Sequence, residues 1–155
     1  AKDNHLSPAS SDKRPPWGII PIIVWMLLQI PRLIAIPIIK DVIAGYDSPA
    51  FMFPAILDIV VAIAAPFVAF VFWRKKGLAV WVIAIIFFTV SIVDHFDTIT
   101  AGLIAPVPRI FGGPNAPITN PALVPGIQAI IDAIALVMLT RKKIRSYYLD
   151  IGSAE

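Results

Sequence analysis

The chain has 155 residues, of which 58% are hydrophobic and 15% are charged, and its mean hydropathy is +0.82. These values exclude an ordinary soluble globular domain and indicate an integral membrane protein. The formal net charge of +3 comes from short clusters beside apolar runs, which gives no support for nucleic-acid binding, and the absence of cysteine excludes disulfides, iron–sulfur clusters and covalently attached c-type haem within this chain.

Four apolar runs are long enough to cross the hydrocarbon core of a bilayer, which is about 30 Å thick, at about 1.5 Å per helical residue. They cover about residues 17–39, 51–73, 78–101 and 122–140. We therefore predict an all-α integral membrane fold, a single bundle of four transmembrane helices. It lies between a polar N-terminal arm, 1–16, and a basic C-terminal tail, 141–155, which are too short to build cores of their own.

The first run is rich in proline, with Pro21, Pro31 and Pro37. Each proline removes a backbone donor, so we expect a kinked helix whose freed carbonyls are satisfied by neighbouring helices. Lys13 and Arg14 precede the run, as basic residues precede the apolar core of a signal peptide. The run is longer and more proline-rich than such a core, which favours a transmembrane helix.

Basic clusters predict the orientation, because Lys and Arg are retained on the cytoplasmic side of membrane helices. The clusters precede the first run, join the second to the third, and follow the fourth. They consist of Lys13, Arg14, Arg74, Lys75, Lys76, Arg141, Lys142, Lys143 and Arg145. We predict a multi-pass protein of the cell membrane with both termini in the cytoplasm. The Pro/Gly-rich loop 102–121 between the third and fourth helices then lies outside, as an ordered cap over the bundle or against a neighbouring subunit.

Polar side chains inside the four runs are costly in hydrocarbon, so they mark a candidate functional site. They are Gln29, Arg32, Asp58, Asp94, His95, Asp97, Gln128 and Asp132. In the predicted orientation all of them fall in the outer half of the membrane, whereas the cytoplasmic half is almost purely apolar. This pattern predicts a bundle closed on the inside, with a polar pocket that opens outward.

Simpler roles compete for individual members of this set. Arg32 either pairs with a single aspartate or extends to the outer interface. Asp58 caps the second helix if that helix begins late, with Pro54 in its first turn. Gln29 and Gln128 serve as ordinary hydrogen-bonding groups between helices, and the whole set can act as a network that fixes helix register.

Charge balance narrows the chemistry, because four aspartates face one arginine and one histidine. The excess negative charge requires protons, a cation or a basic residue from another subunit. One hypothesis is a divalent or transition metal site formed by Asp94, His95, Asp97 and Asp132, whose ligand types suit Mn, Fe or Zn, or Cu if a partner adds histidines. Asp94, His95 and Asp97 point in different directions on one helix, so a second helix must contribute Asp132 or Asp58.

No catalytic motif decides between functions. His95 is the only histidine within the runs, so the chain alone cannot hold a bis-histidine haem. A phosphate-binding glycine loop, a zinc-protease motif and a nucleophile elbow are all missing from the sequence. Whether the chain is an enzyme, which residues are catalytic and which other cofactor it uses stay open.

Two functional hypotheses remain. The first is a small integral subunit of a larger membrane complex, such as an oxidoreductase of the respiratory or metal-dependent monooxygenase type, in contact with lipid and with other membrane subunits. The alternative is a stand-alone transporter of a cation, metal or proton, or a membrane enzyme, that uses Asp94, His95, Asp97 and Asp132.

Overall fold

The computed structural model describes residues 15–115 and 120–149, so the predictions for the N-terminal arm before residue 15 lie outside the described residues. Within those ranges every regular element is a helix, and four helical stretches are long and apolar enough to cross a membrane. The predicted all-α fold with four spanning helices is confirmed. The stretches are Ile19–Ile43, Pro49–Arg74, Leu78–Ile104 and Leu123–Thr140.

The first stretch, called span 1 below, is divided into α1 (Ile19–Leu27), the 3-10 helix η1 (Ile30–Ile34) and α2 (Ala35–Ile43). The second contains η2 (Pro49–Phe51) and α3 (Met52–Arg74), and the third and fourth are α4 (Leu78–Ile104) and α5 (Leu123–Thr140). Two 3-10 helices, η3 (Arg109–Phe111) and η4 (Gly113–Asn115), follow α4, and α6 (Lys142–Leu149) follows α5.

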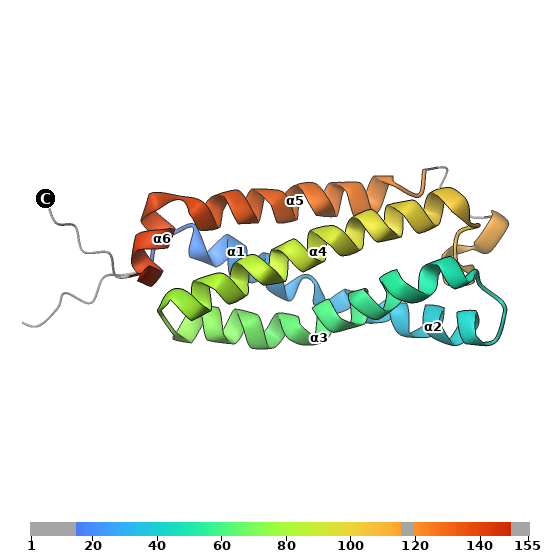
Figure 1. Ribbon diagram of the computed structural model, residues 1–155, viewed down its shortest axis with the longest axis horizontal. Helices are drawn as coiled ribbons and strands as arrows, with labels where there is room; N and C mark the ends of the chain where they lie inside the picture. The colour runs from blue at the N-terminus through green and yellow to red at the C-terminus, as the bar shows by residue number, and fades with distance from the viewer. Residues whose placement is uncertain (1–14, 116–119, 150–155) are drawn as a thin grey trace, which may run out of the picture.

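The long helices lie side by side along the molecule (Figure 1). In the order of packing, span 1 contacts α3, α3 contacts α4, and α4 contacts α5. α6 lies at one end of the bundle, and α2 lies towards the other. We call the first the basic end and the second, where η3 and η4 are found, the loop end.

The break in span 1 is explained by the positions of its prolines. Pro21 and Pro37 fall in the first turns of α1 and α2, where backbone N–H groups have no partner within the helix, so they do not interrupt it. Pro31 lies just beyond the end of α1, and it prevents span 1 from continuing as one α-helix. Leu28 and Gln29 form a turn, and η1 begins at Ile30. The predicted irregularity is therefore concentrated at this one point.

The second spanning stretch begins well before Asp58, whereas a cap at Asp58 would require the helix to begin there. Ser48 is the N-cap of η2, where its hydroxyl accepts a hydrogen bond from the Ala50 N–H at 3.3 Å. α3 then begins at Met52, which places Asp58 in its second turn. The alternative that Asp58 caps this helix is wrong, because Ser48 and Pro49 supply the start.

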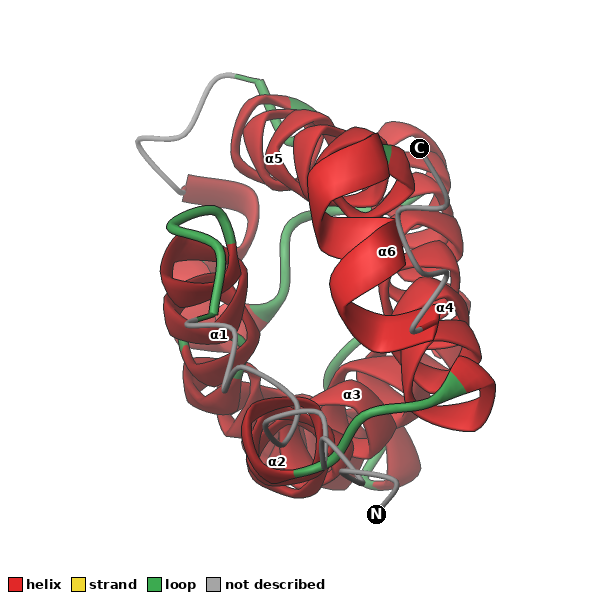
Figure 2. Ribbon diagram, turned by 90° about the vertical axis from the view of Figure 1, so that its left-hand side faces the viewer, coloured by secondary structure: helices red, strands yellow, loops and turns green. Residues whose placement is uncertain are grey.

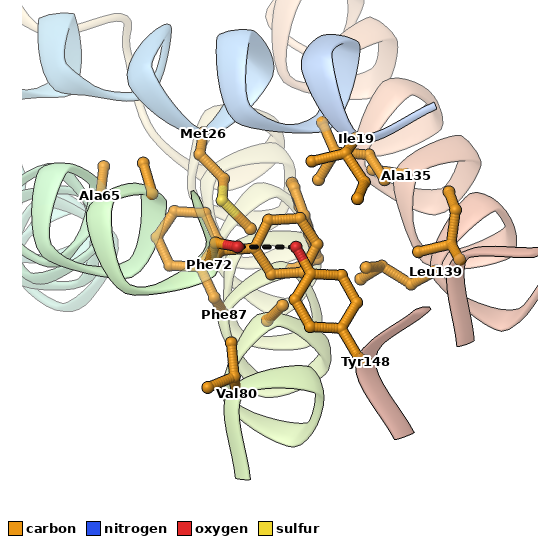
Figure 3. Packing of buried hydrophobic residues seen from close by; sticks show 14 of the residues in the cluster. Ile19, Met26, Ala65, Phe72, Val80, Phe87, Ala135, Leu139 and Tyr148 are labelled. Carbon is orange, nitrogen blue, oxygen red and sulfur yellow. Dashed lines mark hydrogen bonds between the residues drawn. The ribbon is translucent and has the colours of Figure 1, made fainter. Parts of the chain in front are cut away.

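Two separate apolar cores stabilise the bundle. The larger, at the basic end, is drawn in Figure 3, which labels nine members: Ile19, Met26, Ala65, Phe72, Val80, Phe87, Ala135, Leu139 and Tyr148. The smaller, at the loop end, consists of Ala35, Ile38, Val42, Phe51, Ala55 and Ala101. In span 1 and α4 the buried polar residues fall in the interval between the two cores, and in α3 the partly buried Asp58 does, so a polar layer separates the cores.

α6 is a helix that the sequence analysis treated only as a basic tail. Its Tyr148 is 1% exposed, stacks on Phe72 with ring centroids 4.5 Å apart, and donates a hydrogen bond to the Phe72 carbonyl at 2.6 Å (Figure 3). That carbonyl lies in the last turn of α3, where it has no partner within the helix. The Gly77 N–H in turn donates to the Tyr148 carbonyl at 2.9 Å. α6 therefore closes the basic end of the bundle.

Candidate functional site

Arg32 is the centre of the buried polar network. It extends from η1, is 6% exposed, and donates from NH1 to Asp94 Oδ2 at 2.9 Å. Its Nε lies 3.4 Å from Asp58 Oδ1, and its NH2 lies 3.0 Å from His95 Nδ1 and also contacts His95 Nε2. Arg32 thus joins span 1 to α3 and α4.

Asp132 of α5 is the second centre. Its Oδ1 accepts hydrogen bonds from Trp25 Nε1 at 2.5 Å and from Gln29 Nε2 at 3.1 Å, and its Oδ2 lies 3.2 Å from His95 Nε2. Trp25 and Gln29 are four residues apart, so they project from one face of span 1 towards α5. All four spanning stretches therefore meet in one network.

We call Arg32, Asp58, Asp94, His95 and Asp132 the charged layer. In it three carboxyl groups face one guanidinium and one imidazole, so full ionisation would leave an excess of negative charge. Asp94 and Asp132 are fully buried, and Asp58 is 24% exposed. Several polar atoms at this level lack a hydrogen-bond partner within the described residues: Arg32 Nε, Ser91 Oγ, Asp94 Oδ1 and Asp132 Oδ2.

A cavity of about 400 Å³ extends from the charged layer to the loop end. Its polar lining consists of Arg32, Asp58, His95, Thr98, Asn120 and Gln128. Most of the remaining lining is apolar, and at the loop end it includes Val107, Pro108 and Phe111 from the segment after α4. A volume of this size is in the range of small-molecule sites, which are mostly apolar with a few polar groups.

Comparison with protein-family models, with curated proteins and with solved structures gives no match. The function of the charged layer is therefore argued from its geometry and chemistry.

Six of the eight polar residues singled out in the sequence are connected in this network: Gln29, Arg32, Asp58, Asp94, His95 and Asp132. Gln128 lines the cavity without joining the network. Asp97 is half-buried and makes no side-chain hydrogen bond or ion pair with the residues described here. Trp25 and Ser91 were not singled out in the sequence. Each lies one helical turn before a residue that was: Trp25 precedes Gln29, and Ser91 precedes His95.

The hypothesis of a metal site formed by Asp94, His95, Asp97 and Asp132 finds no support in the geometry. Among the residues that the structure describes, no group of three or more His, Cys, Asp or Glu side chains is arranged to hold a metal ion. Arg32 lies against Asp94 and His95, where a metal ion bound by these two side chains would have to lie. A guanidinium has no lone pair to offer a metal ion.

Proposed function

We propose that the protein is a proton-linked membrane carrier that binds a small solute in the cavity above the charged layer. The observation that carries this proposal is the position of the layer: it lies at the break in span 1, between two separate apolar cores, and at the floor of a cavity that extends to the loop end.

The break in span 1 supports a moving part. Discontinuous helices with polar groups at the break are characteristic of solute sites in transporters, and a 3-10 segment within a spanning helix often marks a hinge. α1 packs in the core at the basic end and α2 packs in the core at the loop end. η1 joins two bodies that have their own apolar contacts, which is the arrangement that a rocking motion needs.

The charge of the layer supports the link to protons. Three ionised carboxylates that face one guanidinium would leave an excess of negative charge, which is costly in a membrane interior. Taking up a proton relieves this excess, and so does binding a solute with a complementary charge. Exchange of a solute against a proton requires a site that binds either the proton or the solute, but not both at the same time.

The test uses the purified protein in vesicles that contain a pH-sensitive dye, with a pH gradient imposed across the membrane. Solutes that share one apolar body and carry a cationic, neutral or anionic head are added in turn. We expect at least one of them to move protons faster than in protein-free vesicles. Asp94→Asn, which removes one charge of the layer and preserves its shape, is expected to abolish the excess rate.

Asp41→Asn is the matched control, because it makes the same chemical change in α2, where Asp41 makes no side-chain hydrogen bond or ion pair with a described residue and does not line the cavity. It should keep the rate of the unaltered protein. The carrier proposal is abandoned if no head group moves protons faster than the protein-free vesicles do, or if Asp94→Asn and Asp41→Asn behave alike.

The second candidate is a subunit of a larger membrane assembly, including an oxidoreductase, with both termini in the cytoplasm. It is favoured by the large outward-facing surface of the spans, each of which buries only 22–39% of its most apolar window. Lipid or neighbouring subunits cover such a surface equally well. Native mass spectrometry after mild extraction from the source membrane separates the two: a heteromeric mass supports the subunit, and a lone chain or homo-oligomer supports the carrier.

A further inference from the structure

Span 1 and α5 meet in the apolar core of the basic end and at Asp132, and they pack together only sparsely elsewhere. α4 packs against both α3 and α5, and span 1 packs mainly against α3, whereas direct packing of α1 or α2 against α5 is sparse. Figure 2, which looks along the bundle, shows α4 on one side and α1 on the other, with α5 across from α2 and α3. The described contacts between span 1 and α5 include the hydrogen bonds from Trp25 and Gln29 to Asp132.

The cavity reaches the membrane-facing surface along this seam. Leu28 and Ile34 of span 1 and Val124 of α5 line the cavity, and they are 56%, 49% and 55% exposed. Side chains that are half exposed and also line an internal cavity stand at its opening. Because these residues belong to spanning stretches, the opening faces hydrocarbon in the half of the membrane next to the loop end. The seam therefore admits molecules that are already dissolved in the bilayer.

The walls require a ligand with an apolar body. The cavity lining contains side chains such as Ile38, Phe51, Pro54 and Phe111, and its charged and ionisable groups are Arg32, Asp58 and His95. A fully hydrated ion would leave the apolar walls unmatched, whereas a molecule with an apolar body and a polar head matches both parts.

The head is selected by the carboxylate of Asp58. Arg32 uses NH1 for Asp94 and NH2 for His95, and faces Asp58 only through Nε at the longer distance of 3.4 Å. Asp58 is also the charged-layer carboxylate that lines the cavity and is partly exposed. With Asp94 and Asp132 behind it, three carboxyl groups face one guanidinium at the floor of the cavity. A positively charged head is stabilised there, and an anionic head is repelled.

We propose that the cavity binds a cationic amphiphile, an amine or quaternary ammonium on an apolar body, which arrives from the bilayer between span 1 and α5 and pairs with Asp58. This inference rests on the proposed carrier function and names its solute class. Arrival of the cation and departure of a proton then leave the charge of the layer unchanged.

The test measures equilibrium binding to the full chain in nanodiscs, with empty nanodiscs as the reference for partitioning into lipid. The probes are 4-phenylbutylamine, 4-phenylbutanol and 4-phenylbutanoate, which have the same body and differ only in the charge of the head. We expect the amine to bind about tenfold more tightly than the alcohol, as a hydrogen bond to a charged group allows, and the carboxylate to bind more weakly than the alcohol.

Asp58→Asn should weaken binding of the amine about tenfold and leave binding of the alcohol unchanged, because it removes the charge and preserves the volume. Asp41→Asn is again the control and should change neither. The ligand class is wrong if the alcohol or the carboxylate binds the unaltered protein as tightly as the amine, or if Asp58→Asn retains full amine affinity. The comparison of the three heads on the unaltered protein decides the matter even if Asp58→Asn does not fold.

Failure of this inference is distinguishable from failure of the carrier proposal. Binding of the amine without proton movement in vesicles refutes the carrier and supports the ligand class. Proton movement driven by the alcohol or the carboxylate, without selective binding of the amine, supports the carrier and refutes the ligand class.

Discussion

Replacing Arg32 with glutamine removes the one guanidinium that faces both Asp58 and Asp94. Arg32 is 6% exposed and Asp94 is fully buried, so neither water nor any other cation among the described residues takes over the pairing. Removing one partner of a buried ion pair costs about 3–5 kcal/mol, because the other charge is left uncompensated. We expect Arg32→Gln to lower the free energy of unfolding by about this amount.

The double variant Arg32→Gln/Asp94→Asn tests whether the loss comes from the stranded charge. With both charges gone, two neutral amides of similar size occupy the site, and most of the lost stability should return, with a coupling of about 2–3 kcal/mol between the two positions. The assay is equilibrium unfolding of the purified protein in mixed micelles of mild detergent and SDS, followed by helical circular dichroism.

Arg109→Gln is the matched control, since Arg109 is an exposed arginine that stacks over the Tyr46 ring at 4.8 Å and makes no ion pair with a described residue. It should change the unfolding transition little. The reasoning is refuted if Arg32→Gln is no more destabilising than Arg109→Gln, or if Asp94→Asn adds to its effect instead of restoring stability.

Two further predictions concern the ends of the bundle. Tyr148→Phe leaves the buried Phe72 carbonyl unpaired and should cost about 1–3 kcal/mol in the same assay. Burial raises the pKa of Tyr148, so this stabilisation is complete below the reference pKa of about 10 and should fall as the pH rises above it, a dependence that Tyr148→Phe loses. Gly102→Ala would place a Cβ 2.8 Å from Pro121 Cβ and should destabilise the loop end by about 1–3 kcal/mol. The Cβ that Gly126→Ala adds has no neighbour within 4 Å, and this change should stabilise α5 by up to about 1 kcal/mol. Equal effects of the two glycine substitutions on stability would contradict both expectations.

The spanning stretches were predictable because hydropathy alone determines them. The layer was predictable in composition for a related reason: a buried charge such as Asp94 or Asp132 stands out against an apolar run. Asp97 was included in the predicted cluster on the same basis, and the structure gives it no side-chain hydrogen bond or ion pair with a described residue.

The pairing within the layer could not be predicted from the sequence. Which aspartate meets Arg32 depends on the rotation of each helix about its axis and on the break at Gln29, and neither is encoded in local periodicity. Trp25 was not recognised as a partner of Asp132 because a tryptophan in an apolar run is normally read as packing or as an interfacial residue. α6 was missed because its sequence is short, basic and polar, and only its contact with Phe72 gives it a structural role.

The closure of the basic end by α6 has a consequence for biosynthesis. Because α6 follows all four spans in the chain, Tyr148 can pack on Phe72 only after all four have been synthesised. Until then the ring of Phe72 and the carbonyls at the end of α3 lack their partner. A chain that terminates at residue 141 would therefore contain every transmembrane segment and still present an unfinished, apolar surface at the membrane boundary. The cell's quality-control proteases could distinguish it there from the completed protein.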